Sequence, residues 1–302
     1  MKFSAHIPLG VITPGQFQTM EAIAEMGRAL EAANIHACHL TDHPAPDAGW
    51  LHANGHDAVD PFTALAFVAA VTTRIMLHTH VVVLPYRNPF ITAKAAATLQ
   101  VLSGGRLILG IGGGYMKSEF EALGVDFHKR GALTDEALEV MRLAWAGGAV
   151  SYKGMGFDAK GNEPRPAPDP QPLIWVGGGS DKAIERAARH GDGWAPFFAA
   201  PNLSEINRRT GIQSVGQLAE KIAQLKALRA QMGRTGPFDF AIGTHQKPKA
   251  LSRAAAESLL EEFDAFAKAG VTWTWIDPPH DSRSAYLEHI DWFGREVVAK
   301  SN

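Results

Sequence analysis

The chain has 302 residues, of which 46% are hydrophobic and 20% are charged, and its formal net charge is −2. A chain of this length and composition buries a core large enough to fold without disulfides or a structural metal. The small net charge gives no electrostatic reason to expect nucleic acid or an anionic membrane surface as a partner.

The first residues lack the apolar core of a secretory signal, and no uncharged apolar run is long enough to cross a membrane. We therefore expect a cytoplasmic location by default. The single cysteine, Cys38, excludes a disulfide within the chain. Its alternating surroundings predict a small buried residue rather than a nucleophile, because no activating partner is evident.

Short apolar runs alternate with amphipathic segments through the first half of the chain. In chain order, the predicted strand and helix pairs are residues 3–7 with 16–33, 36–41 with 60–72, 74–84 with 89–102, and 106–112 with 130–146. The apolar residues of 16–33 recur at helical spacing. The second helix begins at Asp60-Pro61, an N-cap residue followed by a first-turn proline.

An irregular stretch then interrupts the alternation. Residues 150–157 are predicted to form a hairpin or an irregular insert, and the Pro- and Gly-rich residues 161–172 a long surface loop. The alternation resumes with the pairs 173–176 and 181–190, 193–197 and 215–232, 238–242 and 252–269, and 271–276 and 283–300. Because the same kind of unit continues after the loop, we interpret residues 1–302 as one domain.

Eight strand–helix units in regular order indicate an α/β fold with a parallel sheet and helical crossovers. Eight is the number of units that closes a (β/α)8 TIM barrel, here with an insertion after strand four. A doubly wound open sheet is the alternative. In a barrel the active site lies at the carboxyl ends of the strands, so the residues that follow each strand are the candidates for function.

Two glycine-rich segments follow strands of the predicted barrel. Gly177-Gly178-Gly179-Ser180 precedes a helix, where backbone N–H groups favour an anion such as phosphate, although a tight turn explains the glycines equally well. Residues 110–114 resemble a dinucleotide fingerprint in part, but they lie on the fourth strand and lack the acidic partner. Glycines at this place let a flat ring system approach the backbone.

Asp42 and His43 are adjacent at the end of the second strand, so their side chains diverge. One of them is suited to position a ligand while the other exchanges protons, since histidine as a residue type serves acid–base chemistry near neutral pH. The alternative is a turn-forming aspartate and an exposed histidine before Pro44. The sequence alone leaves both interpretations open.

His78 and His80 are two residues apart on the third strand and share a face. This spacing suits a pair of metal ligands, as in barrel hydrolases, or two hydrogen-bonded core histidines. We find no cysteine pair, no His-Glu-x-x-His motif and no later-strand carboxylate that completes a ligand set. Trp194, at the start of the sixth strand, is expected to pack in the core rather than line a pocket.

Several segments, taken together and in order, resemble the luciferase-like monooxygenase family, and within it the branch of deazaflavin (coenzyme F420)-dependent oxidoreductases. They are residues 84–89 (LPYRNP), 102–115 (LSGGRLILGIGGGY), 119–120, 130–131, 135–136, 175–180 (WVGGGS) and 191–194 (GDGW), with Thr41-Asp42-His43 before them. Each motif is weak alone, but the ordered set is specific. After Trp194 only the barrel pattern matches.

The resemblance implies a (β/α)8 barrel, usually dimeric, with a two-electron cofactor across the carboxyl-end rim and His43 as proton donor or acceptor. It also implies that the His80–Val81 peptide bond is cis. The cofactor-binding residues that it implies are Asp42, His80, Val81, Gly113, Gly114, Tyr115, Gly177, Gly178, Gly179 and Ser180. Sugar-phosphate dehydrogenases of this branch have a glutamate where this chain has Tyr115, which argues against a sugar-phosphate substrate.

We therefore expect a flavin- or F420-dependent oxidoreductase or monooxygenase that acts on a small organic substrate. Coenzyme F420 is the first choice of cofactor and FMN the second, with a homodimer as the assembly and a separate flavin or F420 reductase as a further partner. Two alternatives stay open: a metal-dependent barrel hydrolase that uses His78, His80 and Asp42, and a non-catalytic flavin-binding barrel. The long loops, residues 44–57 and 150–172, would set the substrate.

Overall fold

The computed structural model describes residues 1–302 with the exception of residues 12, 14, 54, 201–204, 249 and 302. Its parallel strands close a barrel in the order β1-β10-β9-β8-β7-β4-β3-β2, which confirms the predicted (β/α)8 fold and excludes an open sheet. The barrel strands are β1 (Lys2–His6), β2 (Ala37–Leu40), β3 (Met76–Val83), β4 (Leu107–Gly112), β7 (Leu173–Gly177), β8 (Gly193–Ala195), β9 (Asp239–Gly243) and β10 (Trp273–Ile276).

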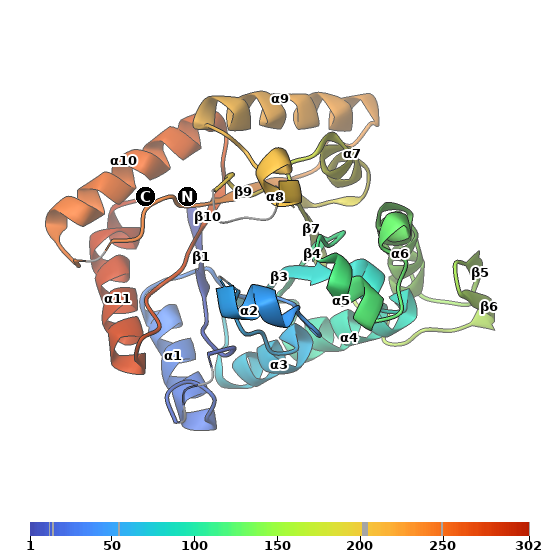
Figure 1. Ribbon diagram of the computed structural model, residues 1–302, viewed down its shortest axis with the longest axis horizontal. Helices are drawn as coiled ribbons and strands as arrows, with labels where there is room; N and C mark the ends of the chain where they lie inside the picture. Colours follow the sequence, from blue (N-terminus) through green and yellow to red (C-terminus); the bar gives the residue numbers. More distant parts are fainter. Residues whose placement is uncertain (12, 14, 54, 201–204, 249, 302) are drawn as a thin grey trace.

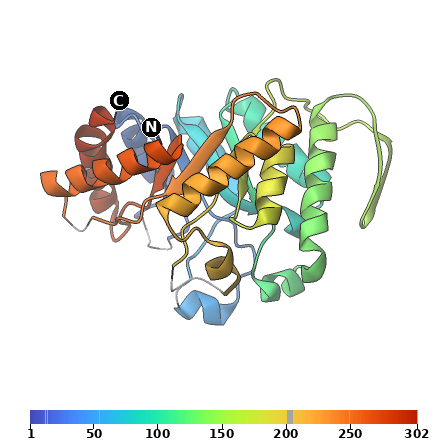
Figure 2. The ribbon, with the colours of Figure 1, turned by 90° about the horizontal axis from the view of Figure 1, so that it is seen from above.

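Helices cover the outside of the barrel (Figure 1, Figure 2). They are α1 (Met20–Ala32), α3 (Pro61–Val71), α4 (Pro89–Leu102), α6 (Arg130–Trp145), α7 (Asp181–His190), α9 (Val215–Gln231), α10 (Arg253–Ala269) and α11 (Arg283–Glu296). Most begin at a polar side chain that accepts a hydrogen bond from a first-turn N–H group, as Asp60 does from Thr63. Among the described residues, no helix combines the length and the apolar character needed to cross a membrane.

The structure departs from the predicted elements in several places, among them α1, which begins at Met20 rather than at residue 16, and β8, which ends at Ala195 rather than at residue 197. Short helices that the sequence periodicity does not reveal lie in loops after strands: α2 (Ala48–Ala53), α5 (Lys117–Ala122) and α8 (Glu205–Thr210). Six residues span less than two turns, too few for apolar spacing to be visible. The insertion is a hairpin of β5 (Val150–Gly154) and β6 (Phe157–Asn162), longer than predicted, and α11 ends at Glu296 before a 3-10 turn.

The space between the barrel and its helices forms the main core. Trp194 is fully buried there, as predicted, and its indole N–H donates to the carbonyl of Gly178 at 2.8 Å. Cys38 is also fully buried, and burial raises the pKa of its thiol to about 12. A protonated, inaccessible thiol is no nucleophile, which confirms the structural interpretation of Cys38.

The inside of the barrel is filled by aromatic rings that stand against glycines. A Cβ atom added to Gly193 on β8 would lie 2.4 Å from the ring of Trp175 on β7, and one added to Gly243 on β9 would lie 2.4 Å from Trp275 on β10. Both separations are far below van der Waals contact, so only glycine leaves room for these rings. Large and small residues thus complement each other on neighbouring strands.

We predict that Gly193→Ala lowers the free energy of unfolding by about 1–3 kcal/mol, because the new methyl group collides with Trp175 in a closely packed interior. Gly236→Ala is the matched control. No atom lies within 4 Å of its added Cβ, so we expect it to be neutral or to stabilise the protein by a few tenths of a kcal/mol. Urea denaturation of both variants measures the difference, and equal effects would contradict this account of the interior.

Candidate functional site

The loops after β2, β3 and β4 meet at one buried carboxylate, Glu119 on α5. Its Oε1 accepts from the N–H of Ala45 at 3.0 Å. Its Oε2 accepts from the Tyr86 hydroxyl at 2.8 Å and from Nδ1 of His43 at 3.2 Å. Ala45 and His43 follow β2, and Tyr86 ends the 3-10 turn η1 (Leu84–Tyr86) that follows β3. Glu119 therefore fixes three loops of the rim relative to one another.

The same contacts define the protonation states around Glu119. Burial raises the pKa of its carboxyl, but the hydrogen bonds from His43, Ala45 and Tyr86 outweigh burial and hold that pKa below its ordinary value. Burial, together with the bond to Glu119, raises the pKa of Tyr86, so its phenol stays protonated. An ionised carboxylate only accepts, so His43 carries a proton on Nδ1 and leaves Nε2 free to exchange one.

Aromatic side chains surround the imidazole of His43, which is 9% exposed. Ring centroids lie 4.7 Å away for Trp50, 5.2 Å for His56 and 6.2 Å for Tyr115. Burial, followed by the charge of Glu119, raises the pKa of Tyr115 to about 12, so this residue is a neutral phenol. Trp50 and His56 belong to the loop expected to set the substrate, and the structure brings them to the predicted acid–base residue.

Asp42 faces away from His43 and has a different task. Its carboxylate is 3% exposed and accepts from the N–H of Val83 at 3.1 Å. It also forms a bidentate ion pair with Arg87, with N–O distances of 2.6 and 2.8 Å. These bonds tie the loop after β2 to the end of β3. The expected contact between Asp42 and a cofactor stays a prediction, but the carboxylate itself is engaged by protein groups.

The end of β3 is irregular and turns two successive side chains into the barrel mouth. The register with β4 shifts between Thr79 and Val82, and the His80–Val81 peptide bond is cis, as the resemblance implied. His80 lies against Trp275 across the interior, with 4.4 Å between ring centroids. Val81 lies between β4 and β7, where a Cβ on Gly112 or Gly177 would come within 2.9 and 3.2 Å of it.

Deeper in the barrel, His78 packs against Trp175 at 4.9 Å, and neither of its ring nitrogens has a hydrogen-bond partner in the structure. Burial lowers the pKa of His80 to about 3 and that of His78 well below its ordinary value, so both rings are neutral. Over the described ranges, no group of three or more His, Cys, Asp or Glu residues is arranged to hold a metal ion. The metal-hydrolase alternative therefore gains no support.

The opposite side of the mouth carries polar residues that the sequence analysis missed. Nδ1 of His39 lies 3.0 Å from the Ser4 hydroxyl, and its Nε2 lies 3.8 Å from Asp277, the residue directly after β10. Burial raises the pKa of Asp277, but the interactions with His39, His6 and Lys247 together outweigh burial and hold that pKa below its ordinary value. The sequence analysis looked for a later-strand carboxylate only as a metal ligand and so did not name Asp277, which the strand-end rule applied to β10 identifies.

The glycine-rich segments follow β4 and β7, as predicted. Gly114 has φ +77°, and a Cβ there would lie 2.7 Å from both Phe120 and Val83. Gly178 has φ +92°, and the Ser180 hydroxyl accepts from the first turn of α7 at 3.2 Å. Packing and backbone geometry account for Gly114 and Gly178. The phosphate site at Gly177–Ser180 stays a prediction, since a helix N-terminus is suited to an anion but does not identify one.

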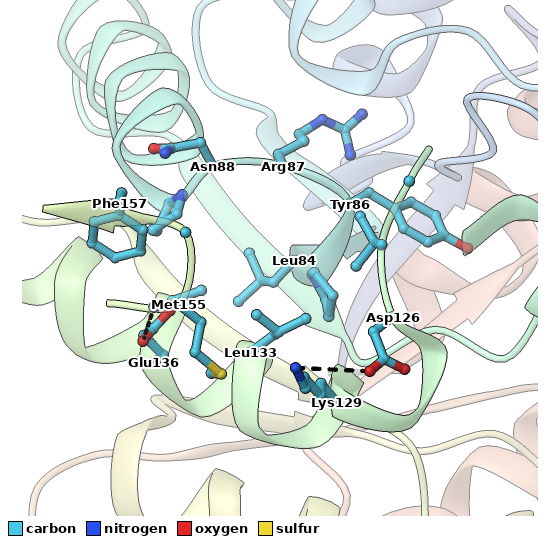
Figure 3. A pocket seen from close by; sticks show the side chains of 16 residues that line it. Leu84, Tyr86, Arg87, Asn88, Asp126, Lys129, Leu133, Glu136, Met155 and Phe157 are labelled. Carbon is cyan, nitrogen blue, oxygen red and sulfur yellow. Dashed lines mark hydrogen bonds and ion pairs between the residues drawn. The ribbon is translucent and has the colours of Figure 1, made fainter. Parts of the chain in front are cut away.

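A groove of about 530 Å³ lies between η1, α6 and the tip of the β5–β6 hairpin (Figure 3). It borders the contacts of Glu119 and Asp42 described above, which we call the rim framework. Tyr86 and Arg87, which hold the carboxylates of Glu119 and Asp42, belong to its wall. The hairpin tip is fixed by the bond from Met155 N–H to Glu136 at 2.9 Å. The rim framework is therefore reached from two sides, the barrel mouth and this groove.

The structure is a closed parallel barrel whose candidate functional residues gather at the carboxyl ends of the strands, where the active sites of TIM-barrel enzymes lie. The sequence profile of the luciferase-like monooxygenase family matches residues 1–294, and the chain belongs to this family. The recognition made from the sequence is thus confirmed.

Relatives in sequence and structure agree with this placement. The uncharacterized protein Rv0940c of Mycobacterium tuberculosis is 34% identical over 71% of this chain and 73% of its own length. An F420-dependent glucose-6-phosphate dehydrogenase of Mycobacterium avium is 32% identical over 63% of this chain and 57% of its own length.

Solved structures share the fold over nearly the whole chain. An F420-dependent secondary alcohol dehydrogenase in complex with an F420–acetone adduct has a TM-score of 0.75 at 19% identity, covering 99% of this chain and 98% of its own. The monooxygenase RslO1 from Streptomyces bottropensis has a TM-score of 0.73 at 19% identity, covering 100% of both chains. At this identity the likeness shows the fold alone.

We predict that Glu119→Gln lowers the free energy of unfolding by about 2 kcal/mol at pH 7, since hydrogen bonds to a buried charged acceptor are lost or weakened. The folded pKa of Glu119 is lowered, so its ionisation stabilises the protein fully above the ordinary value of 4.5 and loses this effect as the pH falls through the folded pKa. The difference in the free energy of unfolding between wild type and Glu119→Gln must therefore decrease below pH 4.5.

Denaturation at several pH values measures this difference. Glu121→Gln is the matched control, because Glu121 lies on the same helix but is 64% exposed beside Lys117. If the difference in the free energy of unfolding between wild type and Glu119→Gln stays constant from pH 7 to pH 3, the carboxylate is not ionised in the folded protein.

Proposed function

We propose that this protein is an F420-dependent oxidoreductase that acts on a small organic substrate at the carboxyl end of the barrel. The observation that carries the proposal is the end of β3, where Val81 stands between Gly112 and Gly177. The imidazole of His43, held by Glu119, lies on the same carboxyl-end rim of the barrel. F420-dependent relatives in sequence and in fold support it.

The residues at the mouth fit a flat ring with an anionic tail. Val81 offers an apolar surface, and the absence of side chains on Gly112 and Gly177 lets Val81 lie close to both strands. The backbone at Gly177, Gly178, Gly179 and Ser180 precedes α7, whose N-terminus favours a phosphate. Gly113, Gly114 and Tyr115 would lie along the ring and tail, with His80 beneath. F420 supplies the two-electron hydride chemistry when bound.

The chain's own residues supply proton transfer and shielding from water. Glu119 and Tyr86 hold His43 in one orientation, so Nε2 receives or delivers the substrate proton without a conformational search. Trp50 and His56 cover the imidazole and lower its contact with solvent. A non-catalytic flavin-binding barrel has no need for a buried carboxylate that orients a rim histidine, so this geometry favours an enzyme.

We also propose a homodimer and a cytoplasmic location. Apolar side chains on α3 and α4 lie open to solvent, with exposed fractions of 46% for Phe67, 65% for Ile91, 51% for Val101 and 78% for Leu102. The two helices are neighbours on one side of the barrel (Figure 1). Exposed apolar surface of this kind marks protein contacts. A monomer in light scattering at micromolar concentration would contradict the dimer.

Titration of the purified protein with F420 and with FMN, each oxidised and reduced, tests the choice of cofactor. We expect F420 to bind with a Kd below roughly 10 μM and FMN at least about tenfold more weakly. The reverse order, with tight binding of reduced FMN, favours an oxygen-using monooxygenase fed by a separate reductase. Binding of neither cofactor below roughly 100 μM would contradict both.

The variant His43→Asn separates cofactor binding from chemistry. We expect it to bind F420 like the wild type but to lose turnover by about 100-fold or more on any substrate found, the typical effect of a general acid or base. His128→Asn changes an exposed histidine outside the loops expected to set the substrate, so this control should keep both F420 binding and turnover. Full turnover of His43→Asn would exclude the acid–base role.

A further inference from the structure

A second cavity of about 850 Å³ lies beside the barrel mouth, between α10, α11 and the loops that follow β9 and β10. Figure 1 shows these elements on the side of the barrel opposite the β5–β6 hairpin. The volume is within the range of small-molecule sites. None of the residues placed above at the cofactor end of the rim belongs to its wall.

The inner end of this cavity is shared with the barrel mouth. Asp277 belongs to the cavity wall and also lies 3.8 Å from Nε2 of His39, inside the mouth. His280 is part of the same wall, and its ring lies 6.4 Å from that of His6 on β1. A ligand in the cavity therefore lies against Asp277 and His280, two residues that also approach side chains of the mouth.

The floor of the cavity is apolar and its wall holds an unsatisfied polar atom. Leu251, Leu259, Ile276 and Phe293 contribute the apolar surface. His289 on α11 belongs to the wall and is 4% exposed, yet its Nδ1 has no hydrogen-bond partner in the structure. Burial lowers the pKa of His289 to about 4, so the ring is neutral.

The charged residues of the wall favour a cation. Among the described residues of the wall, Asp277, Asp281 and Glu288 carry carboxylates, and Lys247 carries an ammonium group 3.5 Å from Asp277. Carboxylates over an apolar floor attract a positively charged group and disfavour a carboxylate of the same shape.

We propose that this cavity binds the substrate, and that the substrate is an organic amine with an apolar body. This inference rests on the proposed function, because the candidate cofactor residues lie on β3, β4 and β7 while the cavity opens at β9 and β10, on the other side of the closed barrel. The apolar body lies on the floor, the ammonium group faces the carboxylates, and the reacting carbon reaches the mouth past Asp277.

Binding of three compounds with one body and different head groups tests the proposal. We would titrate the protein, with and without F420, with 4-phenylbutylamine, 4-phenylbutan-1-ol and 4-phenylbutyrate by calorimetry. The expected order is amine tightest, alcohol weaker and carboxylate weakest, with at least about tenfold between the first and the last. Equal affinities, or no binding of the amine under either condition, would overturn the proposal.

Two variants locate the binding. The double variant Asp281→Asn and Glu288→Gln leaves Asp277 and the mouth intact. It should lower the affinity for the amine about tenfold and leave the affinity for the alcohol unchanged. Ala285→Phe fills the cavity and should abolish binding of all three compounds, with thermal unfolding as the check that it folds. Glu185→Gln, an exposed carboxylate on α7, is the control for charge. Unchanged amine affinity in the first variant would exclude the cavity as its site.

The outcomes separate this proposal from the proposed function. Amine binding without any F420 binding would leave the cavity as a ligand site and reject the F420-dependent function. F420 binding without amine binding under either condition would keep the function and reject the cavity as the substrate site.

Discussion

The buried carboxylate of Glu119 is the interaction on which the carboxyl-end rim depends. Strands of a barrel end at separate points, and the loops after β2, β3 and β4 have no backbone ladder to hold them together. Glu119, which belongs to the loop after β4, accepts from the other two loops at once, through His43 and Ala45 after β2 and Tyr86 after β3. An ionised acceptor in a water-free place strengthens each of these bonds and penalises any arrangement that leaves one unmade. The rim is consequently ordered before any ligand arrives.

Two neighbouring residues divide structure from chemistry at this rim. The carboxylate of Asp42 is turned inward, where it forms an ion pair with Arg87 and accepts a hydrogen bond from the N–H of Val83. These contacts position the end of β3. His43 is turned the other way, and among the described residues its Nδ1 is the nitrogen that is hydrogen-bonded, to Glu119. Successive residues of extended chain point to opposite sides. The chain thereby places a rigid support and a proton-exchanging group within one dipeptide, each served by its own partner from a later strand.

The fold was readable from the sequence because its signals are local. Residues 181–190 were predicted as a helix and α7 spans Asp181–His190, since Ser180 caps its first turn. The contacts of the site are not local: Glu119 lies 76 residues from His43, and His39 meets Asp277 only when the barrel closes. The family resemblance therefore predicted functional roles for His43 and Val81, whereas Glu119 appeared only as part of a matching motif and received no role. The three short loop helices were missed because helices of this length depend on tertiary contacts rather than on propensity.

The pairing of glycines with interior rings also limits how this barrel can change. Replacing Gly193 by a larger residue requires a smaller residue at position 175 in the same step. The same dependence links Gly243 and Trp275. A single replacement inside the barrel passes through a destabilised intermediate, whereas replacements in the loops after the strands do not. New substrate preferences are thus more accessible to laboratory evolution through the loops, and libraries that vary interior positions should vary both members of each pair together.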